Sequence, residues 1–337
     1  MATAGATVAA GLGRPPAAKK QSRIRKLLAG PVTGTPTFPA PANDPAGAGD
    51  YGNISQNAGQ QAWLLPGQYY LSADIVLSTA GQQLYGCGPG TVINQGSSYP
   101  GSGGLFSPAA SSVRLSNFAV NVTPVPFIDF SNAFLDYPEI GHITVTAGTA
   151  GMSGPAAGIF TSPDFHRSAF HDLVLIQNSG ANAVFTQGSS GSGLPATSFE
   201  RIVTIAGPDG TSGNRTVPAW SILLPGNKNA GVLRFGRCFT LNNIANNTLD
   251  NTQPMMDFAC TGIATGTAGD RLLLRGCDFG QCLGGAVRVR SYTCVELDHV
   301  TVGNVFTQPG SGSAADFLPG KRGRDLFAGV HYGAYSI

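Results

Sequence analysis

Two carboxylic acids near the middle of the chain, Asp172 and Glu200, have neighbours that could help them cleave a glycosidic bond. Glycoside cleavage uses two carboxyl groups about 5 to 9.5 Å apart, one protonating the leaving oxygen and one acting as base or nucleophile. His171 could tune the acid. The alternative is structural, because Arg201 could neutralise Asp172 in a ladder of charges at the corner of a repeating element.

The elements that position these residues belong to a repeat. An apolar residue, two polar or small residues, another apolar residue, any residue and then an apolar residue or Thr recur in SAFHDLVLIQN, TSFERIVTIAG and VELDHVTVGN. Copies alternate with period two and begin 23 to 39 residues apart, which favours a solenoid of strands over helical repeats. The predicted interior triplets are Leu115/Phe118/Val120, Ile140/Ile143/Val145, Phe170/Leu173/Leu175, Phe199/Ile202/Thr204, Phe235/Cys238/Thr240, Leu274/Cys277/Phe279 and Leu297/Val300/Val302.

Stacking of the coils places the polar pairs of the repeat in two columns. Neighbouring coils of a parallel β-helix lie about 4.8 Å apart, so we expect His171 beside Glu200 and Asp172 beside Arg201. The equivalent pairs include Ser116-Asn117, Arg275-Gly276 and Asp298-His299. Because no single reaction would use such different pairs, we interpret Asp298-His299 as the corner of a coil.

One segment near the start of the repeat resembles a known superfamily. LLPGQYYL and LYGCGPGTVI, within Trp63 to Ile93, are similar to the entry coils of the pectate-lyase-like β-helix superfamily, which includes phage tailspikes and polysaccharide-degrading enzymes. With the repeat, the resemblance covers roughly Trp63 to Asn304. It implies an all-β, right-handed parallel β-helix, the hand that parallel crossover connections also favour. It does not indicate one activity, because lyases, hydrolases and inert virion parts share the fold.

Residues 1–50 form a separate unit that is rich in Ala, Gly, Pro and Thr. No acidic residue precedes Asp44, and from Asp44 onward the chain has 20 − 6 = 14 basic against 18 acidic residues. We therefore predict an extended anchoring arm over 1–50, which could also touch nucleic acid or an anionic membrane. Its start is a poor secretion signal, and no apolar run is long enough to span a membrane. The predicted anchoring residues are Arg14, Lys19, Lys20, Arg23, Arg25 and Lys26.

The cysteines are interpreted as free and buried, because the chain is long and contains no CxxC pair. The histidines do not complete a zinc-finger spacing. No metal site and no cofactor are therefore expected. The six cysteines are Cys87, Cys238, Cys260, Cys277, Cys282 and Cys294.

A glycan could bind to aromatic and basic side chains on the solenoid. The candidates are Tyr137, His166, Arg167 and Trp220, of which His166 and Arg167 belong to the densest ionisable stretch, PDFHRSAFHD. The β-helix is predicted over 51–310 and is followed by a C-terminal docking segment over 311–337, whose apolar residues would suit a homotrimer of parallel solenoids.

These features lead to a functional prediction with alternatives. The favoured prediction is a virion structural protein on the particle surface, similar to a tailspike or head spike, made in the host cytoplasm, anchored to other particle proteins by its arm and binding a surface polysaccharide. This favoured prediction does not require the protein to be an enzyme. The alternative is a polysaccharide lyase or glycoside hydrolase acting through Asp172, Glu200 and His171. A purely structural subunit without a glycan partner is a third possibility.

Overall fold

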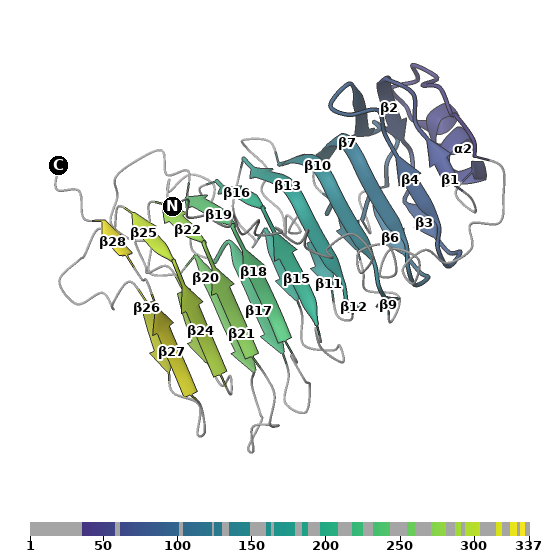
Figure 1. The fold of residues 1–337 in the computed structure, drawn as a ribbon. Helices are drawn as coiled ribbons and strands as arrows, with labels where there is room; N and C mark the ends of the chain where they lie inside the picture. Colours follow the sequence, from purple (N-terminus) through teal and green to yellow (C-terminus); the bar gives the residue numbers. More distant parts are fainter. Residues whose placement is uncertain are drawn as a thin grey trace, which may run out of the picture.

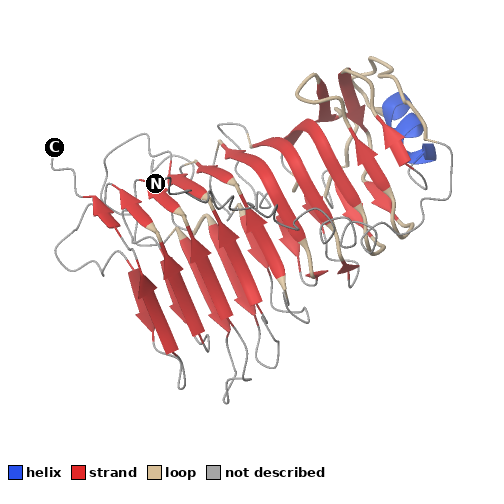
Figure 2. Cartoon of the chain, in the orientation of Figure 1, coloured by secondary structure: helices blue, strands red, loops and turns tan. Residues whose placement is uncertain are grey.

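The chain folds into an elongated stack of short parallel strands, with a helix at one end and β28 at the other (Figures 1 and 2). Every pairing between the described strands is parallel. The predicted parallel β-helix is therefore confirmed. The structure, a computed structural model, describes residues 36–57, 61–100, 104–122, 125–129, 135–148, 160–162, 165–178, 184–187, 196–207, 218–224, 232–242, 255–260, 271–280, 287–290, 294–303, 315–318, 324–328 and 331–333.

The largest sheet, here sheet A, has 17 strands. Each coil contributes two successive segments to sheet A, and a corner separates them. In β7, β10 and β13 both segments belong to one strand that continues through the corner. The strands of sheet A are β1 (Gln61–Trp63), β2 (Gly67–Leu71), β4 (Gln83–Tyr85), β5 (Thr91–Gln95), β7 (Arg114–Val122), β10 (Glu139–Ala147), β13 (Ala169–Gln177), β15 (Thr197–Glu200), β16 (Val203–Ala206), β18 (Val232–Gly236), β19 (Phe239–Asn242), β21 (Arg271–Arg275), β22 (Asp278–Gly280), β24 (Cys294–Asp298), β25 (Thr301–Gly303), β27 (Arg324–Ala328) and β28 (His331–Gly333).

A second sheet, sheet B, has nine strands, one from each coil that it covers. A further pair of short strands, β9 (Leu135–Asp136) and β12 (Phe165–His166), forms a separate two-stranded sheet. The strands of sheet B are β3 (Ile75–Leu77), β6 (Phe106–Pro108), β8 (Ile128–Asp129), β11 (Phe160–Ser162), β14 (Phe185–Gln187), β17 (Trp220–Leu224), β20 (Met256–Cys260), β23 (Val287–Arg290) and β26 (Ala315–Leu318).

The interior triplets predicted from the repeat stack in register. Phe170, Phe199 and Phe235 are successive partners in sheet A, and their rings stack with centroid separations of 5.0 and 4.7 Å. Trp220, from sheet B, meets the Phe199 and Phe235 rings edge-on. Such aromatic pairs contribute about 0.5–1.5 kcal/mol each beyond the burial of apolar area. The core is thus a continuous column between the two sheets.

One backbone feature explains why the repeat has two polar residues between its apolar positions. The second residue of each pair has a positive φ, between 51° and 68°, which is the left-handed region. This conformation interrupts the inward and outward alternation of a strand, so two successive side chains face solvent before the next one turns inward. These corner residues are Asn117, His142, Asp172, Arg201, Arg237, Gly276 and His299.

Helix α2 (Ala48–Asn57) closes the first coil, and the sequence did not predict it. Ile54 is buried in the core, and Asp50, which is fully buried, accepts hydrogen bonds from the backbone N–H groups of Ala42 and Tyr70 at 2.5 and 2.9 Å. Thr37 forms a parallel bridge with Ala62. Residues 36–50 therefore pack against the solenoid, and the boundary predicted at residue 50 is wrong. Their Pro-rich composition concealed contacts that depend on backbone groups.

At the other end, described strands continue the solenoid into the segment that was predicted to dock. Strands β26, β27 and β28 pair with β23, β24 and β25 of the preceding coil. Docking and trimer formation stay predictions. The six predicted anchoring residues lie outside the described residues. Among the described helices, none combines the length and the apolar character that crossing a membrane requires.

Candidate functional site

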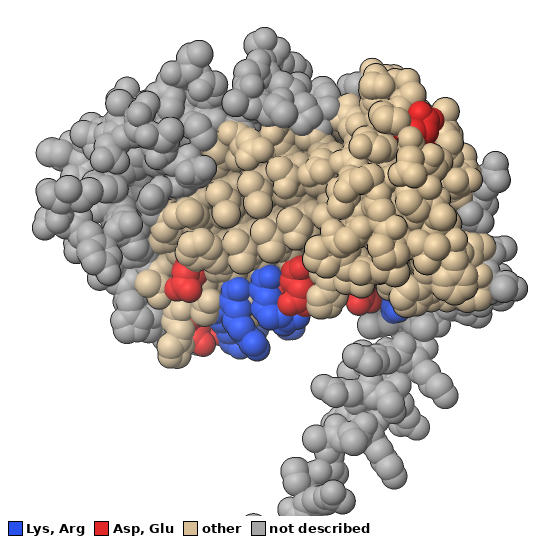
Figure 3. Space-filling view, turned by 90° about the horizontal axis from the view of Figure 1, so that it is seen from above, with Lys and Arg blue, Asp and Glu red and all other residues tan. Residues whose placement is uncertain are grey.

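Most of the charged side chains visible in Figure 3 gather in a band along one edge of the described surface. The outward positions and corners of sheet A supply most of them, and opposite charges meet between neighbouring coils. Arg114 on β7 pairs with Glu139 on β10 at 3.2 Å, for example. The other ionisable residues of the band include His142, His171, Asp172, Glu200, Arg201, Arg234, Arg271, Arg275 and Glu296.

The predicted contact between Asp172 and Arg201 is present. Arg201 donates from Nε to Oδ1 at 2.6 Å and from Nη2 to Oδ2 at 2.7 Å. His171 Nδ1 lies 2.9 Å from the same Oδ2. A two-pronged bond between a guanidinium and a carboxylate is strong and directional, so the Asp172 carboxylate is held in one orientation.

The pKa values of Asp172 and His171 are shifted in opposite directions. The hydrogen bonds from Arg201, followed by the bond with His171, hold the pKa of Asp172 well below its usual range. A hydrogen bond with Glu139, whose Oε1 lies 3.4 Å from His171 Nε2, raises the pKa of His171 although burial opposes the shift. Asp172 is thus ionised at neutral pH, and this geometry does not favour it as a proton donor to a leaving group.

His171 and Glu200 are partners in the register of sheet A, as the repeat predicted. Their side chains lean in opposite directions along the stack, because each occupies space beside a glycine. A Cβ at Gly141, on the preceding coil, would lie 2.2 Å from the His171 ring, and a Cβ at Gly236, on the following coil, would lie 2.2 Å from the Glu200 carboxylate. The three groups therefore do not point toward one common position. The glycosidase roles of Asp172, Glu200 and His171 stay predictions.

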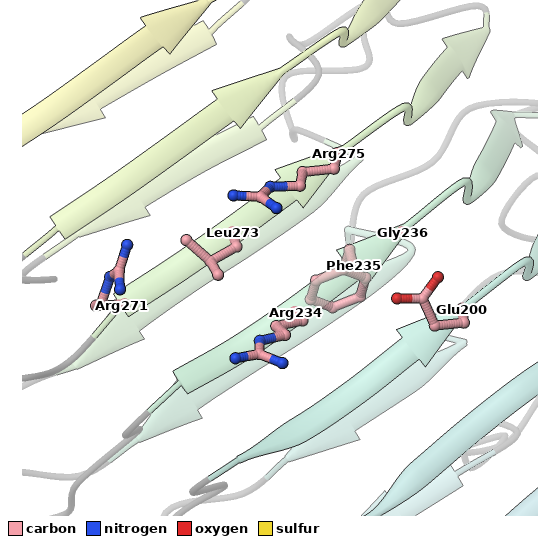
Figure 4. Close-up of a pocket in the computed structure, with 7 residues that line it drawn as sticks. All are labelled: Glu200, Arg234, Phe235, Gly236, Arg271, Leu273 and Arg275. Carbon is pink, nitrogen blue, oxygen red and sulfur yellow. The ribbon is translucent and has the colours of Figure 1, made fainter. Parts of the chain in front are cut away.

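Glu200 instead faces a pocket of about 390 Å³ that opens on sheet A (Figure 4). The labelled side chains come from β15, β18 and β21. Arg234, Arg271 and Arg275 supply three guanidinium groups, and Leu273, which is only 7% exposed, lies at the outward position between the last two. The pocket thus combines positive charge with an apolar surface.

The three arginines of the pocket differ in their partners. Glu296 on β24 is bonded to Arg271 at 3.3 Å and to Arg275 through Nε at 3.1 Å. Within the described part of the chain, neither Arg234 nor Glu200 takes part in an ion pair. Arg234 is exposed, so its guanidinium is available to an anion that enters the pocket.

Sequence reasoning missed the grouping of these arginines. The predicted columns of polar pairs include Arg275, but they do not include the outward positions earlier in the same strands. Arg234 and Leu273 are partners in the register, and Arg271 lies two residues before Leu273. The signal was present in LRFGR and RLLLRG, where arginines flank buried leucine and phenylalanine.

The residues predicted to bind a glycan have different positions. Tyr137 and Arg167 occupy stacked corners, and an Arg167 guanidinium nitrogen donates to the Tyr137 hydroxyl at 2.7 Å. His166 lies in β12, and the structure does not describe its side chain. Trp220 is 1% exposed and packs in the aromatic core, so the prediction that it stacks on a sugar is wrong. From the sequence, Trp220 is interpreted as a surface residue because the strand that turns it inward, β17 of sheet B, is not recognised there.

Three cysteines whose side chains the structure describes, Cys87, Cys238 and Cys277, are free. Cys238 and Cys277 are buried in one interior column, as predicted, and the Cys238 thiol donates to the Phe199 carbonyl at 3.5 Å. Cys87 is exposed, against the prediction, because it lies in the GCGPG turn.

No family model matches the chain, and no curated protein does. Two solved structures are similar: the A-modules of the mannuronan C-5 epimerases AlgE6 and AlgE4 from Azotobacter vinelandii. AlgE6 has 13% identity and a TM-score of 0.31, over 85% of this chain and 94% of that one; AlgE4 has 12% identity and a TM-score of 0.30, over 86% and 92%. Neither likeness is close enough to indicate what this chain acts on.

Proposed function

We propose that the protein binds an acidic polysaccharide across sheet A, in the pocket formed by Arg234, Arg271 and Arg275. The single observation that supports this proposal is the convergence of three guanidinium groups from two neighbouring coils around an open pocket. Guanidinium groups bind carboxylates through paired hydrogen bonds, and uronic acid units present such carboxylates at regular intervals.

Two further features favour a sugar over a small inorganic anion. Leu273 offers an apolar contact for the C–H face of a sugar ring between two cationic groups. The pocket also lies within the band of charges that runs along the solenoid, so a linear polymer could continue over neighbouring coils (Figure 3). Binding would combine a few buried contacts with electrostatic attraction along the polymer.

The test is binding of the full chain to polygalacturonate and to a neutral polysaccharide of similar length, over a range of salt concentrations. We expect polygalacturonate alone to bind, with an affinity that falls as salt rises. Arg234→Gln should weaken binding at least tenfold, since a hydrogen bond to a charged group contributes about 1.5–3 kcal/mol.

Arg114→Gln is the matched control, because it removes an equal charge from the same face of sheet A, on β7 and away from the pocket. Equal weakening by both variants would point to diffuse attraction and contradict the pocket. Equal binding of neutral and acidic polymers would contradict the proposal as a whole.

Eliminative cleavage of the bound polymer is a second candidate. It is favoured by the position of the Glu200 carboxylate, which faces the arginine pocket and has no ion pair with any described residue. Glu200 would take the proton from the carbon next to the sugar carboxylate; a carbon–carbon double bond would form, and the glycosidic oxygen would leave and take a proton from water. Glu200→Gln should abolish unsaturated product, measured by ultraviolet absorbance, while polygalacturonate still binds.

Attachment to a virion through the N-terminal arm, with a homotrimer projecting from the particle, stays a proposal compatible with either role. The arm to be tested is residues 1–35, because residues 36–50 pack on the first coil. Particles that still incorporate the protein without residues 1–35 would contradict anchoring.

A further inference from the structure

Next to the pocket, three side chains on two neighbouring coils converge without any use in the proposed function. His142 is the corner residue of β10, and His171 and Asp172 lie at the corner of β13. The metal-binding atoms that they could offer all lie within 4.8 Å of one another. His142 Nε2 is 3.7 Å from Asp172 Oδ2, and His171 Nδ1 is 2.9 Å from the same oxygen.

These separations suit a small divalent cation. Zinc binds imidazole nitrogen and carboxylate oxygen at about 2.0–2.2 Å, so two ligand atoms in a tetrahedral site lie roughly 3.3 Å apart. The two distances at Asp172 Oδ2 fall on either side of that value. The rings of His142 and His171 are edge-on at 5.2 Å between centroids, which keeps two nitrogens close without stacking the rings.

Neighbouring residues orient the ligands as outer-shell partners do in metal sites. His171 Nε2 faces Glu139 Oε1 at 3.4 Å, so a neutral ring can donate its proton to Glu139 and keep the Nδ1 lone pair for a metal. Arg201 Nε holds the other oxygen of Asp172 at 2.6 Å. The absent side chain at Gly141 leaves room for the His171 ring, whose nearest atom lies 2.2 Å from where a Cβ would be.

We propose that His142, His171 and Asp172 bind one divalent transition-metal ion of the zinc class, with a solvent-facing coordination position. Two imidazoles with one carboxylate favour such ions over calcium or magnesium, which prefer oxygen ligands alone. Binding requires Arg201 Nη2 to share or release Asp172 Oδ2, from which it lies 2.7 Å, while its bond through Nε can remain. The side chain of His142 is 57% exposed, so the open position faces solvent.

His142 and His171 are 29 residues apart in the sequence and meet only when the coils stack. The inference does not depend on the proposed function. If both hold, the ion lies one coil from Glu200, because His171 and Glu200 are register partners.

The experiment is a titration of the untagged full chain, first treated with a chelator, with Zn²⁺ and with Ca²⁺ by calorimetry. Co²⁺ absorption spectra then report the coordination geometry. We expect one Zn²⁺ per chain, no comparable binding of Ca²⁺, and a Co²⁺ spectrum of a four- or five-coordinate site. His142→Ala and His171→Ala should each weaken Zn²⁺ binding at least tenfold.

His299→Ala is the matched control. Like His142, His299 is the corner residue of its coil, and it is bonded to an aspartate, Asp298. The corner residue of the preceding coil is Gly276, which has no side chain that could bind a metal. His299→Ala should leave Zn²⁺ affinity unchanged. Gly141→Ala should weaken Zn²⁺ binding without removing a ligand, and thermal unfolding checks that each variant folds. No Zn²⁺ binding by the wild-type chain, or equal losses in His142→Ala and His299→Ala, would overturn the site and leave corner ion pairs only.

Discussion

At the scale of single residues, the structure shows how a stacked surface makes room for functional side chains. His171 and Glu200 each extend over a glycine on a neighbouring coil, Gly141 and Gly236. A larger residue at either glycine would compete for the same space. The two cases differ in how freely the displaced group can move.

Replacing each glycine by alanine should therefore have unequal effects on stability. The His171 ring is rigid and bonded to Glu139 and Asp172, so Gly141→Ala should lower the free energy of unfolding by about 1–3 kcal/mol, as overpacking does. The Glu200 carboxylate is the free end of a flexible chain, so Gly236→Ala should change stability by no more than about 0.5 kcal/mol. Urea unfolding of both variants measures the difference; equal losses would contradict it.

Residue identities predicted the contact between Asp172 and Arg201 because the register of a parallel stack depends only on the interior pattern. They did not predict which way a side chain leans. The lean of Glu200 toward β18 follows from Gly236, which belongs to a coil 36 residues further on. For the same reason the arginine pocket could be assembled only after the coils were aligned at their outward positions.

At the scale of elements, helix α2 depends on polar contacts rather than on an apolar repeat. Asp44 accepts hydrogen bonds from the backbone N–H groups of Gly49 and Ala46, each at 3.1 Å, and so caps the start of the helix. These bonds, that of Gly49 first, lower the pKa of Asp44. The cap was not predicted because Gly and Pro around it indicate a loop.

This cap makes the stability of α2 depend on pH. Because the pKa of Asp44 is lower in the folded chain, its contribution is complete above the unfolded value of about 3.9 and is lost as pH falls through the folded value. Amide hydrogen exchange in residues 48–57 should therefore be faster in Asp44→Asn than in the wild type at pH 6. The difference should shrink below pH 4, and a constant difference at all pH values would contradict the cap.

At the scale of the whole molecule, a solenoid has two ends that expose its core unless something covers them. Residues 36–57 cover the first coil through Ile54, the Thr37 bridge and the buried Asp50. The repeat predicted the stacking of the coils because each copy carries its own periodic signal. The end cover has no counterpart elsewhere in the chain, so periodicity gives no information about it.

Two truncations should separate the end cover from the arm. Removing residues 1–35 loses none of the described contacts, so the melting temperature should change little. Removing residues 1–57 exposes Leu64, Tyr69 and Leu71 of the first coil and should lower the melting temperature markedly and promote association of the chains. Differential scanning calorimetry with light scattering tests both, and equal stability of the two truncations would contradict the cover.

The left-handed corners have a consequence for how this surface could evolve. Asn, His, Asp, Arg and Gly all occupy that column with nearly the same backbone angles, so the turn places few demands on the identity of the side chain. A point mutation there can change charge, ligand or partner while the core beneath remains as it was. New recognition could thus arise at the corners one codon at a time, and relatives would be expected to diverge there first.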